Sequence, residues 1–275
     1  MLKKSLLMLK NNPLLILMFL LAILIYLIPM FLFMPAIKKI IDISKEITEN
    51  PSNPSAVDLK QMIAMISSIM KLYLFIFILG ILSLLYISGY GNMLAAAVND
   101  GKASFKIFTF GIRKYFGKII LSALLFAAIS IGFAIVISIC TLPFTFAGIA
   151  ANNFDPEKIS AMQIIIQIIV LTISVFLYPF VELWLPATFI ERKEGVISCF
   201  KKGIRAGRQK YLLLVAVSAI IFLPYTVLYI VSGNRYSILE SPLYIVSLAY
   251  QTIIIPVVLA VLFTIYNDLK KENKV

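Results

Sequence analysis

Histidine is absent from this sequence of 275 residues, and its absence removes the commonest general base and the commonest metal ligand. Cysteine is scarce as well, since only Cys140 and Cys199 occur, and these two form no zinc or redox motif. A phosphate-binding Gly-x4-Gly-Lys-Ser/Thr loop is also missing. We therefore expect no catalytic residue, no metal and no cofactor, and we predict that the protein is not an enzyme.

Charged residues make up only 14% of the chain, whereas hydrophobic residues make up 61%. Soluble domains contain about 25% charged and about 45–50% apolar residues. A globule of this length cannot bury so much apolar surface, because much of its side-chain area still faces water. We therefore predict an integral membrane protein, with lipid as the solvent for most of the chain.

Six apolar stretches are long enough to cross about 30 Å of hydrocarbon, for which about 20 residues suffice. They cover residues 13–36, 72–92, 119–145, 162–189, 211–232 and 242–266. The first stretch is too long for a signal peptide, and it lacks a small-residue cleavage site. The predicted fold class is therefore all-α, an integral membrane bundle of six transmembrane helices that forms a single transmembrane domain over residues 1–275.

Lysine and arginine are divided unequally between the two sides of this predicted bundle. Of the 25 basic residues, 18 lie in the segments 1–12, 93–118, 190–210 and 267–275, which share one side. The positive-inside rule places that side in the cytoplasm. We predict a multi-pass protein of the plasma membrane with cytoplasmic N and C termini. Its net charge of +12 then favours anionic lipid headgroups at about 1 kcal/mol per basic residue, and nucleic acid is not an expected partner.

Two of these basic segments repeat one pattern, Phe-x-x-Gly-Ile-Arg-x4-Lys, at an offset of 92 residues. The pattern runs from Phe108 to Lys118 and again from Phe200 to Lys210, and Leu2–Lys10 is a weaker version of it. We predict a basic amphipathic helix on the cytoplasmic surface at each copy, with Phe and Ile beneath the lipid headgroups and Arg and Lys facing them. Chance recurrence in a chain rich in Ile and Lys is the alternative.

The three helices that return to the cytoplasm also end alike. A helix breaker is followed by an acid and then closely by a base, in the sets Gly89, Asp100, Lys102; Pro179, Glu191, Arg192; and Pro256, Asp268, Lys270. We expect the breaker to weaken each returning arm and the acid and base to close each unit at the interface. Three parallel hairpin repeats would then cover about residues 1–100, 101–192 and 193–270, related by an axis along the membrane normal.

The strongest candidates for recognition are basic residues of the repeated pattern. They are Arg113, Lys118, Arg205, Arg208 and Lys210. An arginine at the same place in both copies indicates bidentate contact with phosphate or carboxylate, so these residues are predicted to bind a lipid headgroup or to dock a cytoplasmic protein partner. General anchoring on anionic lipid is the simpler alternative.

Glu182 is the one acid well inside a predicted span, and it lies between two prolines. It is a candidate proton or cation site. The alternative is a carboxylate that reaches toward the interface and pairs with Arg208 or Lys210. Gln163 and Gln167 share a face of the same helix and complete the predicted intramembrane polar site, although such residues also hydrogen-bond between helices for structural reasons.

Two short motifs suggest a resemblance to known proteins. They are Cys199-Phe200-Lys201-Lys202-Gly203 at the entry to a span and Tyr266-Asn267-Asp268-Leu269-Lys270-Lys271-Glu272 at the end of the last helix. The chain resembles a broad group of prokaryotic polytopic membrane proteins that is similar to the membrane domain of some glycerophosphoryl diester phosphodiesterases. The resemblance implies an architecture of repeated hairpins without an established chemistry. The soluble phosphodiesterase domain of those relatives is absent from this sequence, so their catalytic activity does not carry over.

The sequence therefore predicts a non-enzymatic membrane protein that binds or helps transport a lipid or amphipathic solute. The alternative is a permease-like or scaffold subunit whose cytoplasmic helices dock a soluble partner such as an ATPase. The Glu-Ala-Ala-x3-Gly coupling sequence of importer permeases is missing, which weakens this alternative without removing it.

Overall fold

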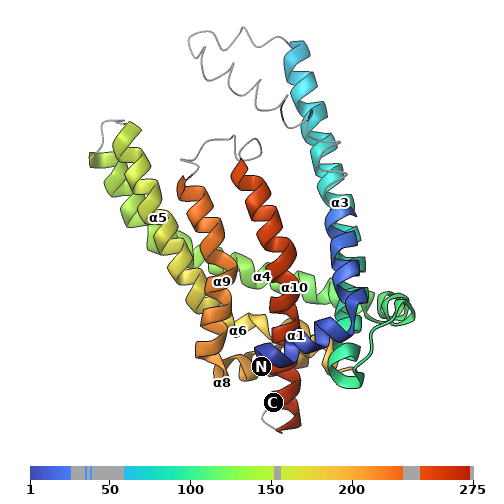
Figure 1. Cartoon of the computed structure of the whole chain (residues 1–275). Coiled ribbons are helices and arrows are strands. Elements are labelled where there is room, and N and C mark those ends of the chain that lie inside the picture. Colours follow the sequence, from blue (N-terminus) through green and yellow to red (C-terminus); the bar gives the residue numbers. More distant parts are fainter. Residues whose placement is uncertain (26–34, 36–37, 39–58, 152–155, 232–241, 273–275) are drawn as a thin grey trace. The chain divides into compact units, whose positions relative to one another are not determined.

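The computed structural model describes residues 1–25, 35, 38, 59–151, 156–231 and 242–272, and the regular structure of these residues is entirely helical (Figure 1). The helices are α1 (Leu2–Asn11), α3 (Leu59–Asp100), α4 (Phe105–Ala151), α5 (Pro156–Leu177), α6 (Pro179–Glu182), α7 (Trp184–Ile190), α8 (Val196–Gln209), α9 (Tyr211–Val231) and α10 (Pro242–Lys271). A further helix, Pro13–Ile25, follows α1. The prediction of an all-α protein is confirmed for the described residues.

Three described helices are each long and apolar enough to cross a membrane, namely Ile66–Asp100 of α3, Phe105–Pro143 of α4 and Thr252–Lys271 of α10. Three bent pairs raise the total to as many as six if each pair is one span. They are Leu2–Asn11 with Pro13–Ile25 (84°), Ile164–Leu177 with Pro179–Ile190 (43°), and Val196–Gln209 with Tyr211–Pro224 (99°). Large apolar side chains along these helices face outward, as a lipid environment favours. The apolar helices are therefore consistent with a membrane-embedded protein.

The chain divides into two compact units. Residues Leu17–Ile87 form one unit, and Met1–Ile16 with Ser88–Val275 form the other, which we call the main unit. In the smaller unit the Tyr86 hydroxyl donates a hydrogen bond to the Met18 carbonyl at 3.2 Å. All candidate site residues of the sequence lie in the main unit, and the prediction of a single domain stays a prediction.

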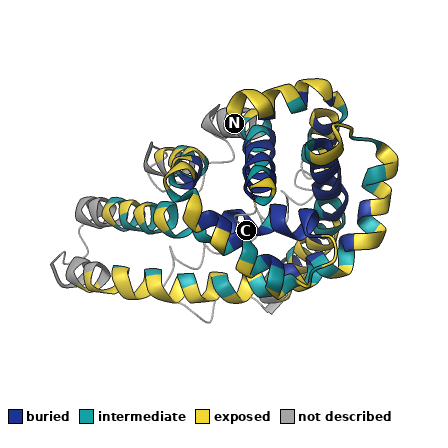
Figure 2. Cartoon of the chain, turned by 90° about the horizontal axis from the view of Figure 1, so that it is seen from below, coloured by how far each residue is buried: buried dark blue, intermediate teal, exposed yellow. Residues whose placement is uncertain are grey.

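The core of the main unit surrounds the end of α10. In the most apolar window of its candidate span, 56% of the α10 residues are buried, compared with 11% for α4. Figure 2 shows the buried residues gathered around the C-terminal end of the chain. Phe189 of α7 fills the centre, with its ring 6.2 Å from that of Phe263 and 5.1 Å from that of Tyr115. These contacts join α4, α7 and α10 into one core.

Glycines allow α8 to lie directly on the backbone of α6 and α7. An ideal Cβ at Gly203 would stand 2.7 Å from the Trp184 Cα, and one at Gly207 would stand 2.6 Å from the Pro179 carbonyl oxygen. Gly111 of α4 lies equally close to α3, since its Cβ would stand 2.7 Å from the Asn92 Cβ and 2.8 Å from the Ser88 carbonyl oxygen. Backbone atoms cannot move aside as a flexible side chain can, so these contacts require residues without a side chain.

The aromatic residues of the repeated pattern contact neighbouring helices. Phe108 lies over Gly89, where an added Cβ would come within 2.5 Å of the ring, and Phe200 lies 5.2 Å from the Trp184 ring in an edge-to-face arrangement. Both side chains therefore contact protein, and both are half-buried. An apolar helix face can pack against a neighbouring helix as well as against lipid, so the predicted contact with lipid headgroups stays a prediction.

The predicted helix breakers also require correction. Only the arm with Pro179 is interrupted, by the bend of 43° between α5 and α6, whereas α10 continues through Pro256 and α3 continues through Gly89. Gly89 makes room for the Phe108 ring instead of weakening α3. Furthermore, α4 runs without interruption from Phe105, while α1 and α8 each bend by nearly a right angle into the helix that follows.

We expect Gly203→Ala to lower the thermal unfolding temperature of the detergent-solubilised protein, because its Cβ would meet the backbone of α7 and overpacking costs about 1–3 kcal/mol. Gly117→Ala in α4 is the matched control, since nothing lies within 4 Å of an added Cβ there. Alanine has a higher helix propensity than glycine by about 1 kcal/mol, so this control should be neutral or stabilising. Circular dichroism during heating measures both changes, and equal shifts would contradict the close approach of α8.

Candidate functional site

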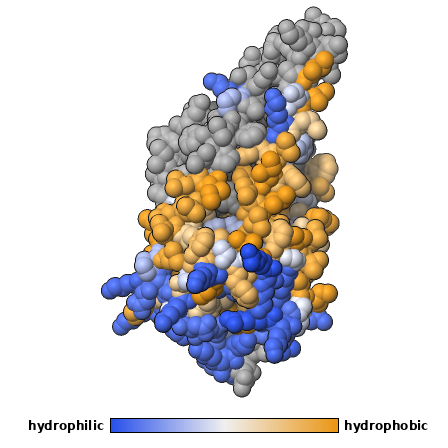
Figure 3. All heavy atoms as spheres, turned by 90° about the vertical axis from the view of Figure 1, so that its right-hand side faces the viewer, coloured by the Kyte–Doolittle hydropathy of each residue, from blue (hydrophilic) through white to orange (hydrophobic). Residues whose placement is uncertain are grey.

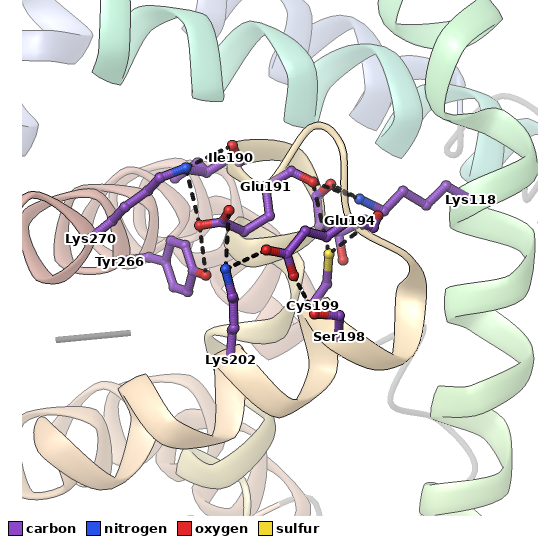
Figure 4. Close-up of polar contacts among 10 residues, drawn as sticks. Lys118, Ile190, Glu191, Glu194, Ser198, Cys199, Lys202, Tyr266 and Lys270 are labelled. Atoms are coloured by element: carbon purple, nitrogen blue, oxygen red, sulfur yellow. Dashed lines mark hydrogen bonds and ion pairs between the residues drawn. The ribbon is translucent and has the colours of Figure 1, made fainter. Parts of the chain in front are cut away.

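A largely buried carboxylate, Glu191, lies at the end of α7 and joins three helices (Figure 4). Its side chain is only 10% exposed. One carboxylate oxygen forms an ion pair with Lys270 at 3.1 Å and accepts a hydrogen bond from the Tyr266 hydroxyl at 3.3 Å, and both residues belong to α10. The other oxygen lies 3.5 Å from the Lys202 ammonium of α8. Glu191 therefore holds α8 and α10 to the end of α7.

Lysines also donate hydrogen bonds to the backbone carbonyls at the end of α7. Lys118 of α4 donates to the Thr188 carbonyl at 2.8 Å and to the Glu191 carbonyl at 3.1 Å, and Lys270 donates to the Ile190 carbonyl at 3.3 Å. The last carbonyls of a helix lack helical donors and carry a partial negative charge, so a cation is favourable there. Lys118 consequently ties α4 to the same point.

Glu194 extends this cluster to the start of α8. Its carboxylate accepts hydrogen bonds from Lys202 and from the Ser198 hydroxyl, and these bonds lower the pKa of the Glu194 carboxyl. Buried Cys199 lies within the cluster, with its Sγ 4.0 Å from the Glu191 carbonyl oxygen. We call this set the Glu191 cluster. Its members are Lys118, Glu191, Glu194, Ser198, Cys199, Lys202, Tyr266 and Lys270.

The N-terminal helix is fixed to the other end of the chain. Lys4 of α1 forms an ion pair with Asp268 of α10, and the buried Ser5 hydroxyl lies 3.1 Å from that of Thr264. Asn12, at the end of α1, accepts a hydrogen bond from the Ala103 N–H at 2.7 Å. A cavity of about 230 Å³ lies beside these contacts and is lined by α1, the end of α3 and Thr264.

Each acid at the end of a returning helix therefore pairs beyond its own predicted unit. Asp268 pairs with Lys4, and Glu191 pairs with Lys270 and Lys202. Asp100 lies 3.9 Å from Arg192 in an exposed contact. The expected closure of each unit by its own acid and base is therefore wrong for the described ion pairs. Asp268 and Lys270 are two positions apart in α10 and face different sides of it, and Lys102 and Arg192 lie beyond the ends of α3 and α7.

The arginines of the repeated pattern remain outside these ion pairs. Arg113, Arg205 and Arg208 are exposed, Lys210 is half-buried, and none of the four forms an ion pair with a described residue. On α8, Arg205 and Arg208 lie on the face opposite Gly203. Of the five predicted recognition residues, Lys118 alone has a side-chain hydrogen bond to a described residue. Figure 3 shows hydrophilic residues gathered at this end of the main unit, with apolar residues beyond them.

Glu182 lies apart from these cations. Its side chain is buried, and one carboxylate oxygen accepts a hydrogen bond from the Ser218 hydroxyl of α9 at 2.6 Å. The other oxygen has no hydrogen-bond partner among the described residues, and no ion pair with Arg208 or Lys210 is present. Gln167 is half-buried on α5 and forms no hydrogen bond with Glu182 in the described part of the chain. The side chain of Gln163 lies outside the described residues.

Sequence reasoning missed Ser218 and the pairing within the Glu191 cluster. Ser218 carries a recognisable signal, because it is the one polar residue in the apolar run from Leu212 to Leu223. Glu191 and Lys270 carry a weaker signal, since both were expected at the membrane interface, but Glu191 beside Arg192 and Lys270 beside Asp268. The contacts of Lys118 with backbone carbonyls have no signal in the sequence, because every residue carries a backbone carbonyl.

No protein-family model, no curated protein and no solved structure matches this chain. The resemblance to the membrane domain of some glycerophosphoryl diester phosphodiesterases therefore stays a prediction.

We expect Glu191→Gln to destabilise the protein clearly, because Lys202 and Lys270 would lose their shared counter-ion. Removing one partner of a buried ion pair costs about 3–5 kcal/mol, and the partial exposure of both lysines reduces this figure. Asp100→Asn is the matched control, since the exposed contact with Arg192 is worth only about 0–1 kcal/mol. Thermal unfolding in one detergent compares the two. A control that loses as much stability as Glu191→Gln would contradict the central position of the cluster.

Proposed function

We propose that this protein is a non-enzymatic, six-span protein of the plasma membrane that binds anionic lipid and helps transport a lipid or amphipathic solute. The carrying observation is the division of charge in the main unit. Lysines of the Glu191 cluster neutralise its acids, whereas Arg113, Arg205 and Arg208 stay exposed and without an acidic partner among the described residues. Cations left in this way are free to bind an external anion.

The orientation of two basic helices supports a position at the lipid headgroups. α8 makes an angle of 99° with the helix after it, and α1 makes an angle of 84°. If the following helix spans the membrane, the basic helix lies along the membrane surface. Exposed apolar side chains accompany the charges, such as Ile197 on α8 and Leu6 on α1, and these would enter the boundary between headgroups and acyl chains.

The chemistry of arginine favours a phosphate ligand. Its planar guanidinium presents several N–H donors in a fixed fork that matches two phosphate oxygens. Its charge is permanent, so binding would persist at any pH that the membrane tolerates. On this proposal the positively charged end faces the cytoplasm, where anionic lipids attract basic residues at about 1 kcal/mol each.

The packing of the surface helices supports the three parallel repeats that the proposal includes. Gly111 packs on Asn92, and Gly203 packs on Trp184, so each glycine meets a residue 19 positions before it. In the proposed repeats, each contact joins the start of one repeat to the end of the repeat before it. Ser5 and Thr264 supply the third such contact, because they join the first unit to the last. Repeats that pack in this cyclic order bring all the basic helices to one membrane surface.

We expect the double variant Arg113→Ala, Arg205→Ala to retain less anionic lipid in native mass spectra of the protein purified in mild detergent. Two basic residues contribute about 2 kcal/mol, which corresponds to a roughly thirtyfold loss of affinity. Native mass spectrometry with added phosphatidylglycerol measures this loss directly. Unchanged lipid occupancy would contradict the proposal.

The matched control removes the same charge from the same end of the main unit. Lys193→Ala with Lys271→Ala deletes two exposed cations that lie outside the repeated pattern. This control should retain more phosphatidylglycerol than the arginine variant. A soluble protein that dissociates from the arginine variant while lipid occupancy is unchanged would instead support the alternative, a subunit that docks a cytoplasmic partner such as an ATPase.

A further inference from the structure

Glu182 occupies an unusual place in the bent candidate span that α5, α6 and α7 form. It ends the short helix α6, after the bend at Tyr178 and two residues before Trp184. Pro179 and Pro186 flank it, and each proline lacks the N–H that a helix would otherwise use. The carboxyl group therefore lies where the backbone offers few donors.

The neighbourhood of Glu182 supplies one hydrogen bond and no cation. Glu182 is 5% exposed and Ser218 is fully buried, so the bond between them is shielded from solvent. α8 covers α6 with Gly207, and α9 contributes the neutral Ser218 hydroxyl. Tyr178 is a titratable neighbour of the carboxylate among the described residues, and its hydroxyl carries no positive charge. No described lysine or arginine pairs with Glu182.

An ionised carboxylate is expensive in such a place. Moving a carboxylate out of water costs several kcal/mol even after the protein relaxes, unless an opposite charge is present. One hydrogen bond from a hydroxyl contributes only about 1.5–3 kcal/mol when its partner is charged. A proton removes the charge altogether, and it leaves the Ser218 bond intact because a carbonyl oxygen accepts it equally well.

We propose that Glu182 is a proton-binding site between α6 and α9, occupied at neutral pH. The proton resides on the carboxylate oxygen that Ser218 does not contact, and the carbonyl oxygen accepts the Ser218 hydrogen bond. This site is separate from the proposed lipid surface, and it does not depend on the proposed lipid binding. It assigns to the protein a second ligand, the proton, inside the candidate span.

The site is connected to the basic surface helix through α9. Ser218 lies eight residues after Lys210, the residue between α8 and α9, which is about 12 Å along a helix. Release of the proton would leave a charge between α6 and α9 and would favour their separation or the entry of water. The protonation of Glu182 thus bears on the position of the helix from which α8 extends.

Infrared difference spectroscopy of the full chain in lipid nanodiscs tests the site directly. We expect the spectrum of the wild-type protein at pH 7 to contain the carbonyl stretching band of a protonated carboxylic acid, and the spectrum of Glu182→Gln to lack it. Glutamine has the shape and neutrality of the protonated acid, so this variant should fold. Absence of the band from the wild-type protein would overturn the proposal.

Two further variants keep the result specific. Ser218→Ala should retain the band and shift it to higher wavenumber, because the carbonyl oxygen loses its hydrogen-bond donor. Glu194→Gln is the matched control, because the pKa of the Glu194 carboxyl is lowered by Lys202 and Ser198 and the group is ionised at neutral pH. This control should leave the band unchanged. A band that disappears in the control or stays unshifted in Ser218→Ala would assign it to another carboxyl group.

Sodium is the competing ligand for a buried carboxylate, and it gives a different result. The unfolding temperature of the wild-type protein should be the same in sodium chloride and in choline chloride if the ligand is a proton. Stabilisation by sodium that Glu182→Gln abolishes would overturn the proton site in favour of a cation site.

Discussion

The structure of the main unit depends on how closely α8 approaches the backbone of α6 and α7. Gly203 and Gly207 make this approach sterically feasible, and it sets where every other residue of α8 lies. Lys202 then reaches Glu191, whereas Arg205 and Arg208 point to the opposite side. A larger residue at either glycine would lift α8 from its support and disturb both arrangements. The packing of two helix backbones thus determines which cations serve stability and which are free.

This division connects stability to function. Burial of Glu191 is tolerated only because Lys202, Lys270 and Tyr266 surround it, since a buried charge must be paired and hydrogen-bonded. The cluster holds three helices at fixed positions and leaves their outer surfaces to the arginines. Glu182 follows the opposite rule, because no cation from the described residues accompanies it and the proposed proton neutralises it instead. The cost of burying a charge therefore explains both the ion pairs around Glu191 and the proposed proton on Glu182.

Much of the architecture could be predicted from sequence, whereas the pairing of its charges could not. Long apolar runs predicted the helices of α3, α4 and α10, because lipid selects for length and hydrophobicity alone. The equal spacing around Gly111 and Gly203 indicated that these positions matter, but the structure shows that each glycine allows close helix packing. The partners of Asp268 and Glu191 were unpredictable, because Lys4 lies 264 residues from Asp268 and local order says nothing of such contacts. The helix contacts of Phe108 and Phe200 were not predicted, because an apolar face can meet protein or lipid equally well.

The proposed architecture requires the basic helix of one repeat to pack on the last helix of the repeat before it. The contact between Ser5 and Thr264, which joins the first repeat to the third, is the most demanding instance. Ser5→Cys with Thr264→Cys, in a chain that also carries Cys140→Ser and Cys199→Ala, tests it by mild oxidation and electrophoresis without reductant. We predict a rapid intramolecular disulfide. Ser5→Cys with Thr252→Cys is the control, because Thr252 lies about 18 Å further along α10. Failure of the first pair to cross-link, or equal cross-linking of both pairs, would contradict the account.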